Sequence, residues 1–206
     1  MKIIAVEEGI ELHYYPLWVE DPAADFLEAE RLSFSPEVVT MFQKASVLKR
    51  QTVDYGLTYS YNPTAKASIE WEPLAVRYRQ RLERQFKIDF PQCACNEYAN
   101  RLAYIGPHHD KSTSVNGVRQ EPLVIASISL GAMRRMVLIP PGVNLKHMQP
   151  TVNWLSKRPG AVVIELEPGS LIVFTNAFNR RWTHSIPKDL KQLVTGKRIS
   201  LTYRHF

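Results

Sequence analysis

The sequence predicts an α+β fold, with helices early in the chain and a β-sandwich or barrel such as a jelly roll after them. Three observations favour this class. The 206 residues are enough for one domain with a sizeable core. Apolar residues recur at helical spacing before Cys93 and in short strand-like runs after it. Pro-Gly turns separate several of those runs, and the 14 Pro and 10% aromatic residues are typical of many short strands.

The first part of the chain is expected to form two strands and two helices. Residues 2–6 and 11–15 have the composition of strands, and Ala23–Leu32 follows a helix start signal. The clearest helix is predicted over Glu72–Phe86, because Pro73 suits a first turn and an apolar residue recurs every four positions. That apolar stripe consists of Leu74, Tyr78, Leu82 and Phe86.

The later part of the chain is expected to be a set of short strands. The β-rich runs are Val124–Leu130, Met136–Ile139, Val162–Leu166, Leu171–Phe174 and Arg198–Tyr203. The polar stretch Gly142–Arg158 between two of these runs is expected to be a surface loop.

Charge and cysteine content limit the class of protein. The net charge of +6 fits a generic basic protein or one that binds a polyanion such as nucleic acid. Cys93 and Cys95 offer no disulfide framework, so we expect core cysteines in a reducing, intracellular compartment. The N-terminal apolar run stops at Glu7 and Glu8, so we expect no signal peptide, and no stretch suggests a membrane span.

A candidate metal site starts at His108. In extended backbone, residues i and i+2 project from the same side, so His108 and Asp110 can bind one ion. His184 is the natural third ligand. Two His and one carboxylate leave positions open, which suits Fe(II) that binds a co-substrate and O₂ together. His109 could be the ligand instead, although in a strand it would face away.

The last strand carries a candidate anion site. Ile199, Leu201 and Tyr203 should face apolar packing, and the alternate residues should face the barrel interior. Those alternate residues are Arg198, Ser200, Thr202 and Arg204. The guanidinium fork binds carboxylates bidentately, so two inward arginines could hold a small dianion. The alternative is an edge strand with solvated arginines.

With these segments, the chain from about Arg50 to Phe206 resembles the AlkB-type branch of the Fe(II)/2-oxoglutarate dioxygenases. The resemblance is closest to animal homologues that repair alkylated nucleic acid. The stretches that carry it are Gly56–Tyr59, Asn96–Tyr98, His108–Asp110, Ala126–Ala132, Gly169–Leu171, Trp182–Pro187 and Arg198–Arg204.

The resemblance implies a double-stranded β-helix with Fe(II), 2-oxoglutarate and O₂ as cofactors. The implied Fe(II) ligands are His108, Asp110 and His184. The implied 2-oxoglutarate site comprises Asn96, Tyr98, Arg198, Thr202 and Arg204, with Arg198 on the distal carboxylate and Arg204 toward the metal. It also implies one domain over 1–206, with an N-terminal elaboration (1–49), a nucleotide-recognition lid and support helix (50–92) and a jelly-roll core (93–206).

The implied reaction is oxidative demethylation of N-alkylated bases in DNA or RNA, with release of formaldehyde, succinate and CO₂. We also expect the chain to be a monomer. Tyr59 and Tyr61 match positions that line a pocket for a flipped base, although alternating strand tyrosines are an equal alternative. By their charge, six basic residues could form a phosphate track: Lys49, Arg50, Arg134, Arg135, Arg180 and Arg181. Ser112 stands where such relatives usually carry an acid. Two alternatives are the same chemistry on a protein or small molecule, and a binding module without activity.

Overall fold

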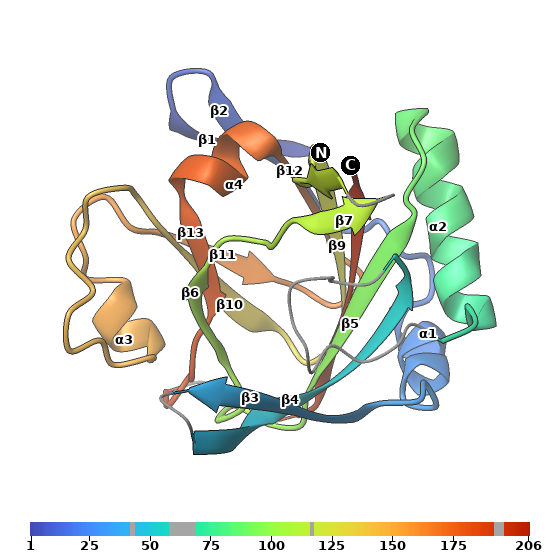
Figure 1. Cartoon of the computed structure of the whole chain (residues 1–206), viewed down its shortest axis with the longest axis horizontal. Coiled ribbons are helices and arrows are strands. Elements are labelled where there is room, and N and C mark those ends of the chain that lie inside the picture. Colours follow the sequence, from blue (N-terminus) through green and yellow to red (C-terminus); the bar gives the residue numbers. More distant parts are fainter. Residues whose placement is uncertain (42–43, 58–68, 116–117, 192–195) are drawn as a thin grey trace.

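The computed structural model describes residues 1–41, 44–57, 69–115, 118–191 and 196–206, and consists mainly of antiparallel strands in two facing sheets (Figure 1). The large sheet contains, in spatial order, β1 (Lys2–Glu7), β2 (Ile10–Tyr15), β12 (Leu171–Thr175), β9 (Val124–Gly131), β14 (Arg198–His205), β5 (Gln92–Tyr98), β4 (Lys44–Gly56) and β3 (Ser35–Met41). The small sheet contains β11 (Val162–Leu166), β10 (Arg134–Ile139), β13 (Thr183–Ile186) and β6 (Ile105–His108). The predicted jelly roll, or double-stranded β-helix, is confirmed, and it is richer in strands than the α+β class suggests.

Two apolar cores lie on opposite faces of the large sheet. One lies between that sheet and two helices, α1 (Pro22–Ala29) and α2 (Pro73–Phe86), and the other lies between the two sheets. Strand β14 is a central strand of the large sheet, so its alternate side chains face the two different cores. Its residues Ile199, Leu201 and Tyr203 are fully buried in the helix-side core, whereas its arginines point the other way. The predicted alternation is therefore confirmed, and it directs the arginines toward the space between the sheets.

The helices follow their sequence signals closely. The Asp21 carboxylate accepts a hydrogen bond from the Ala24 N–H at 3.0 Å, which caps α1. Helix α1 ends at Ala29 and not at the predicted Leu32, because residues 30–32 form a tight turn toward β3. Helix α2 starts at Pro73 and buries the predicted stripe up to Leu82.

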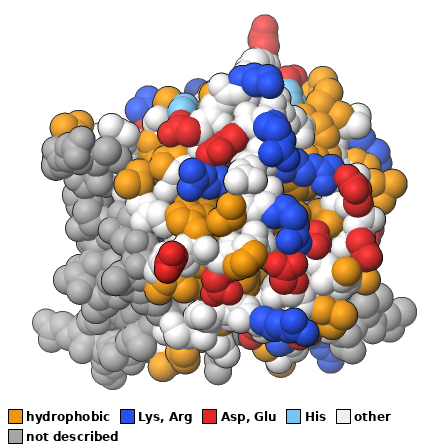
Figure 2. Space-filling model, turned by 90° about the vertical axis from the view of Figure 1, so that its right-hand side faces the viewer, with side chains coloured by type: hydrophobic (Ala, Val, Ile, Leu, Met, Phe, Trp, Pro, Cys, Tyr) orange, Lys and Arg blue, Asp and Glu red, His pale blue; other side chains and the backbone are white. Residues whose placement is uncertain are grey.

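The face that carries α1 and α2 has mixed charge. Figure 2 shows Lys and Arg side chains beside Asp and Glu on this side of the molecule. Arg77 pairs with Asp25 and Glu28, and Arg79 pairs with Glu83 one turn along α2. These arginines therefore form a solvated, locally neutralised surface and not a basic track for a polyanion.

The segment expected as a surface loop over 142–158 contains structure of its own. A short helix, α3 (Val152–Leu155), buries Leu155 against Val137 and Ile139 of β10. The prediction of a simple loop is wrong here because four residues are too few to show a helical period in the sequence.

The N-terminal segment belongs to the large sheet. Strand β2 pairs with β12, which places Leu12 opposite Phe174, and β1 forms the edge beyond it. The expected boundary between residues 49 and 50 falls inside β4, and residues 58–68 of the expected lid lie outside the described residues. In the ranges that the structure describes, every helix is too short or too polar to span a bilayer.

Two glycines with the same backbone conformation allow a test of close packing. Gly131 and Gly142 both have φ of +80°, but an added Cβ at Gly131 would lie 2.4 Å from the main-chain oxygen of Lys197 and 2.5 Å from Phe26. At Gly142 no atom of the described residues would lie within 4 Å of an added Cβ. We expect Gly131→Ala to lower the free energy of unfolding by about 2–4 kcal/mol and Gly142→Ala by about 1–2 kcal/mol, measured by urea denaturation. Equal losses would mean that the contacts around Gly131 relax freely.

Candidate active site

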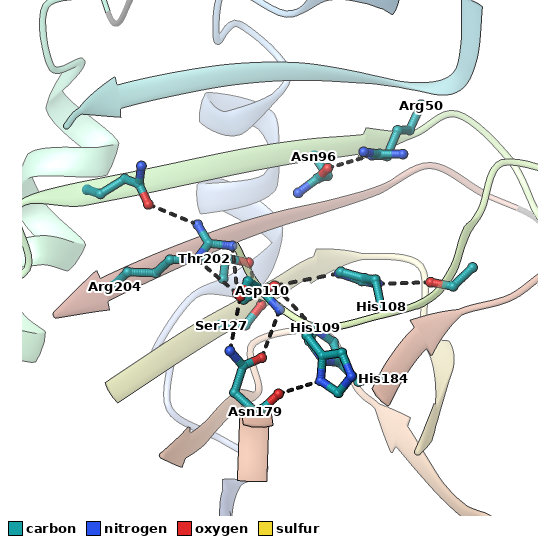
Figure 3. A network of polar contacts seen from close by, with 12 residues as sticks. Arg50, Asn96, His108, His109, Asp110, Ser127, Asn179, His184, Thr202 and Arg204 are labelled. Carbon is teal, nitrogen blue, oxygen red and sulfur yellow. Dashed lines mark hydrogen bonds and ion pairs between the residues drawn. The ribbon is translucent and has the colours of Figure 1, made fainter. Parts of the chain in front are cut away.

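Three side chains that can bind a metal ion converge beside the small sheet (Figure 3). His108 ends β6 and pairs in register with His184 of β13, so the two ring centroids lie 4.3 Å apart. Two residues after β6, Asp110 places Oδ1 3.5 Å from Nε2 of His108 and 3.4 Å from Nε2 of His184. The candidate ligand atoms all lie within 4.8 Å of one another. The structure thus brings together the three residues that the sequence suggested.

The two imidazole rings are set up to offer unprotonated nitrogens. Nδ1 of His108 donates to the main-chain oxygen of Gly106 at 2.8 Å, so in the neutral ring Nε2 is free to bind a metal. Burial lowers the pKa of His184, and the nearby His108 ring adds to this effect. A neutral ring is the form that coordinates a metal.

The carboxylate of Asp110 is held in its charged form. Arg204 of β14 donates from Nε and Nη2 to Oδ2 of Asp110 at 2.9 and 2.7 Å. Burial opposes ionisation of Asp110, but Arg204 and the two imidazoles outweigh it and hold its pKa well below the usual range. Two neutral imidazoles and one carboxylate are a donor set that fits Fe(II), so the residues present pass the test for that ion.

A second polar feature is the buried guanidinium of Arg198 at the other end of β14. The side chain is 1% exposed, and its Nη2 donates to Oγ of Ser129 at 2.9 Å. Nε and Nη1 are buried and have no hydrogen-bond partner in the part of the chain that the structure describes, and the ring of Tyr98 lies 5.2 Å from Cζ. Burial lowers the pKa of Arg198 to about 10, so the group stays charged at neutral pH. A buried cation with two unused N–H groups fits the carboxylate of a small ligand.

The other residues expected at the cofactor lie on the same two strands. Tyr98 and Arg198 are register partners on β5 and β14, and Asn96 lies two residues before Tyr98. Oδ1 of Asn96 accepts from Nε of Arg50 at 2.9 Å (Figure 3). Thr202 shares a hydrogen bond of 2.9 Å with Ser127 of β9. Arg50, expected as a phosphate contact, therefore reaches into the cofactor side of the site.

The sequence-based prediction did not include several polar residues that surround the site. Ser127 and Ser129 belong to β9 and are buried. Two hydroxyls at i and i+2 inside an apolar strand are the sequence signal that could have identified them as inward-facing polar residues. Gln92 is fully buried between Nη1 of Arg204 and the main-chain oxygen of Leu57. Asn179 holds the main chain of Asp110. Neither Gln92 nor Asn179 belongs to a pattern that the sequence alone would single out.

The residues expected to contact substrate are only partly described. Tyr59 and Tyr61 lie outside the described residues. Arg180 and Arg181 are exposed on α4 (Asn176–Arg181), where they form ion pairs with Glu121 and Glu7.

The basic pair at the start of β10 is not available as a phosphate track. Arg134 is 1% exposed and donates to three main-chain oxygens, so its expected phosphate contact is wrong. Arg135 forms a bidentate pair with the buried Asp189. The sequence could not reveal either partner, because two adjacent arginines are usually solvated.

Ser112 is buried two residues after Asp110. Its exposed fraction is 8%, and its hydroxyl accepts from Nε of Arg119 at 2.8 Å. The position next to the metal ligands therefore presents a neutral hydroxyl bound to a guanidinium and no acid.

The chain is similar to a described protein family over most of its length. A model of the 2OG-Fe(II) oxygenase superfamily matches residues 28–204. DNA oxidative demethylase ALKBH2 of Bos taurus is 27% identical over 205 residues, which cover 96% of this chain and 69% of that protein. The human ALKBH2 is 26% identical over 96% of this chain and 74% of its own length. Alpha-ketoglutarate-dependent dioxygenase alkB homolog 3 of Homo sapiens is 28% identical over 75% of this chain and 51% of that protein.

Solved structures support the same fold. The structure of OsALKBH1 superposes with a TM-score of 0.59 at 16% identity and full coverage of both chains. A 2OG-Fe(II) oxygenase family oxidoreductase from Burkholderia pseudomallei gives a TM-score of 0.53 at 15% identity, with 94% of this chain covered and 84% of that one.

Proposed function

The chain belongs to the 2OG-Fe(II) oxygenase superfamily, and on that premise we propose that it oxidatively demethylates N-alkylated bases in DNA or RNA. As a member it is an Fe(II)- and 2-oxoglutarate-dependent dioxygenase. When bound, these cofactors and O₂ supply the oxidation of a substrate C–H bond, with 2-oxoglutarate converted to succinate and CO₂. An N-methyl group oxidised in this way becomes a hydroxymethyl group, which leaves as formaldehyde and restores the base.

The metal-binding residues have distinct tasks in this proposal. His108, Asp110 and His184 would hold Fe(II) through two nitrogens and one oxygen. Arg204 keeps the Asp110 carboxylate ionised and fixes its orientation through two hydrogen bonds. The chain thus contributes a preorganised, correctly charged ligand set before any ion arrives.

The 2-oxoglutarate site would extend along β5 and β14 from the metal to Arg198. The unused N–H groups of Arg198 suit the distal carboxylate, and the ring of Tyr98 packs beside it. Because Oδ1 of Asn96 accepts from Arg50, the amide NH₂ of Asn96 is the group left to donate to a ligand. Thr202 offers a hydroxyl between the two arginines on the same face of β14.

Several features of the chain support a nucleic acid as the substrate. The net charge is +6, and Arg180 and Arg181 are exposed on the helix that leads to His184. Phosphates could replace Glu121 and Glu7 as their partners, and Tyr59 and Tyr61 would stack on the flipped base. The bovine and human ALKBH2 relatives are named DNA oxidative demethylases, which points to nucleic acid as the substrate class.

The observation that carries the proposal is that two features occur in one fold. They are the His108, Asp110 and His184 cluster and the buried guanidinium of Arg198, of which two N–H groups have no partner among the described residues. The first offers a site for a redox-active metal, and the second offers a site for the dicarboxylate that this chemistry consumes. Both lie on the inner face of one jelly roll.

The decisive experiment is a substrate panel. The purified protein with Fe(II), 2-oxoglutarate and ascorbate would be incubated with methylated DNA and RNA, single- and double-stranded, and with methylated peptides. We expect loss of 14 mass units, roughly one CH₂, and equimolar formaldehyde from at least one oligonucleotide and from no peptide. Turnover of peptides alone would favour the alternative, a dioxygenase acting on proteins. Inactivity on every substrate, with no succinate formed, would favour a binding module.

The proposal also includes a reducing cellular compartment, the nucleus or the cytoplasm, and a monomeric state. Cys93 and Cys95 are both buried and free, with their sulfurs 3.6 Å apart. Two buried cysteines without a disulfide between them fit such a compartment.

A further inference from the structure

The main chain of Asp110 lies where strand pairing stops. Strand β6 ends at His108 and β7 (Thr113–Val115) starts five residues later, so Asp110 lies in irregular backbone. Its carboxylate nevertheless has to point at two imidazoles that are fixed by the sheet. A buried main-chain N–H and C=O without ladder partners must be satisfied in another way.

The side chain of Asn179 satisfies both groups. The N–H of Asp110 donates to Oδ1 of Asn179 at 2.8 Å, and Nδ2 of Asn179 donates to the main-chain oxygen of Asp110 at 3.1 Å (Figure 3). Asn179 is 4% exposed, so its side of these two part-buried bonds is shielded from water. A primary amide offers one donor and one acceptor side by side, as the edge of a neighbouring strand would. Asn179 therefore acts as a one-residue substitute for a strand partner.

The element that carries Asn179 is firmly anchored. Phe178 of α4 is fully buried, and its ring lies 5.0 Å from that of Phe174 and 6.3 Å from that of Trp182. Helix α4 leads directly into β13, and Asn179 lies only five positions before His184 along the chain. One short element thus fixes His184 through the chain and Asp110 through hydrogen bonds.

We propose that Asn179 is a positioning residue that sets the main chain of Asp110, and with it the geometry of the metal site. Two hydrogen bonds restrain both the position and the rotation of the Asp110 peptide groups, whereas Arg204 restrains only the carboxylate. The inference depends on the three-ligand metal site but not on the substrate, so it stands even if nucleic acid is not demethylated.

The test uses Co(II) as the probe ion and compares two asparagines of α4. Asn179→Leu removes both hydrogen bonds with little change in size, and Asn179→Ala does so without the risk of a clash. The matched control is Asn176→Leu, because Nδ2 of Asn176 donates to the main-chain oxygen of Pro122 and does not touch a ligand. Co(II) affinity would be measured by titration of its visible absorption, and stability by thermal unfolding of the metal-free protein.

We expect the Co(II) dissociation constant to rise roughly ten- to hundredfold in both Asn179 variants, with an altered absorption spectrum at saturation. Asn176→Leu should bind Co(II) like the wild type, with a similar loss of thermal stability. Unchanged affinity in a folded Asn179 variant, or equal weakening in Asn176→Leu, would overturn the proposal. A wild-type protein that binds no Co(II) would overturn it together with the metal site, independently of any result with methylated oligonucleotides.

Discussion

Replacing His108 with alanine is expected to abolish turnover. Its Nε2 is one of three ligand atoms that lie within 4.8 Å of one another, and no other histidine of the described chain joins that cluster. Loss of a ligand from a three-residue site should weaken metal binding by at least about a hundredfold, more than the loss of a supporting residue. The measurements are succinate formation and Co(II) titration of the purified variant.

The adjacent histidine provides a matched control. His109 is exposed, and its Nδ1 donates to the main-chain oxygen of Asn179, so its ring turns away from the ligand cluster. His109→Ala should keep Co(II) affinity within a few-fold of the wild type. The reverse result, with His109→Ala inactive and His108→Ala active, would show that the neighbouring ring is the ligand. That alternative was open from the sequence alone.

The fold was predictable to the extent that it depends on local periodicity. The four-residue stripe of α2 and the alternation along β14 both correspond to buried faces in the structure. The order of strands was not predictable, because β9 lies between β12 and β14 through hydrogen bonds to residues far away in the chain. Helix α3 was missed because a single turn leaves no period to detect.

The candidate site was predictable where one strand geometry relates the residues. Arg198, Thr202 and Arg204 share one face of β14, so their common direction follows from a period of two. Asp110 reaches the same ion site as His108, as the sequence suggested, but it lies beyond the end of β6, so strand alternation does not account for its placement. Partners supplied by other elements were not predictable. The ring of His184 reaches His108 only because β6 and β13 pair, and Arg134 finds its three carbonyl partners only after folding.

Replacing Arg198 with methionine is expected to remove most of the affinity for 2-oxoglutarate. The variant keeps an unbranched apolar stem but is shorter and loses the buried charge, whose Nε and Nη1 have no hydrogen-bond partner among the residues that the structure describes. Loss of a buried, charge-assisted pair costs about 2–5 kcal/mol, so the dissociation constant should rise at least thirtyfold, roughly. Calorimetric titration of 2-oxoglutarate into the Mn(II)-loaded protein measures this, and Mn(II) affinity itself should be little changed.

Arg134 is the matched control because it is buried to the same degree and lies near the same ring. Its exposed fraction is also 1%, and its Cζ lies 5.6 Å from the Tyr98 ring, but its terminal nitrogens donate to the main-chain oxygens of Asn100, Ala103 and Pro187. Arg134→Met should therefore leave those acceptors unpaired and lower the free energy of unfolding by at least about 2 kcal/mol. Its affinity for 2-oxoglutarate should stay close to that of the wild type. If instead Arg134→Met lost the ligand and Arg198→Met retained it, the distal carboxylate would have to bind Arg134, because both guanidinium groups lie near the Tyr98 ring.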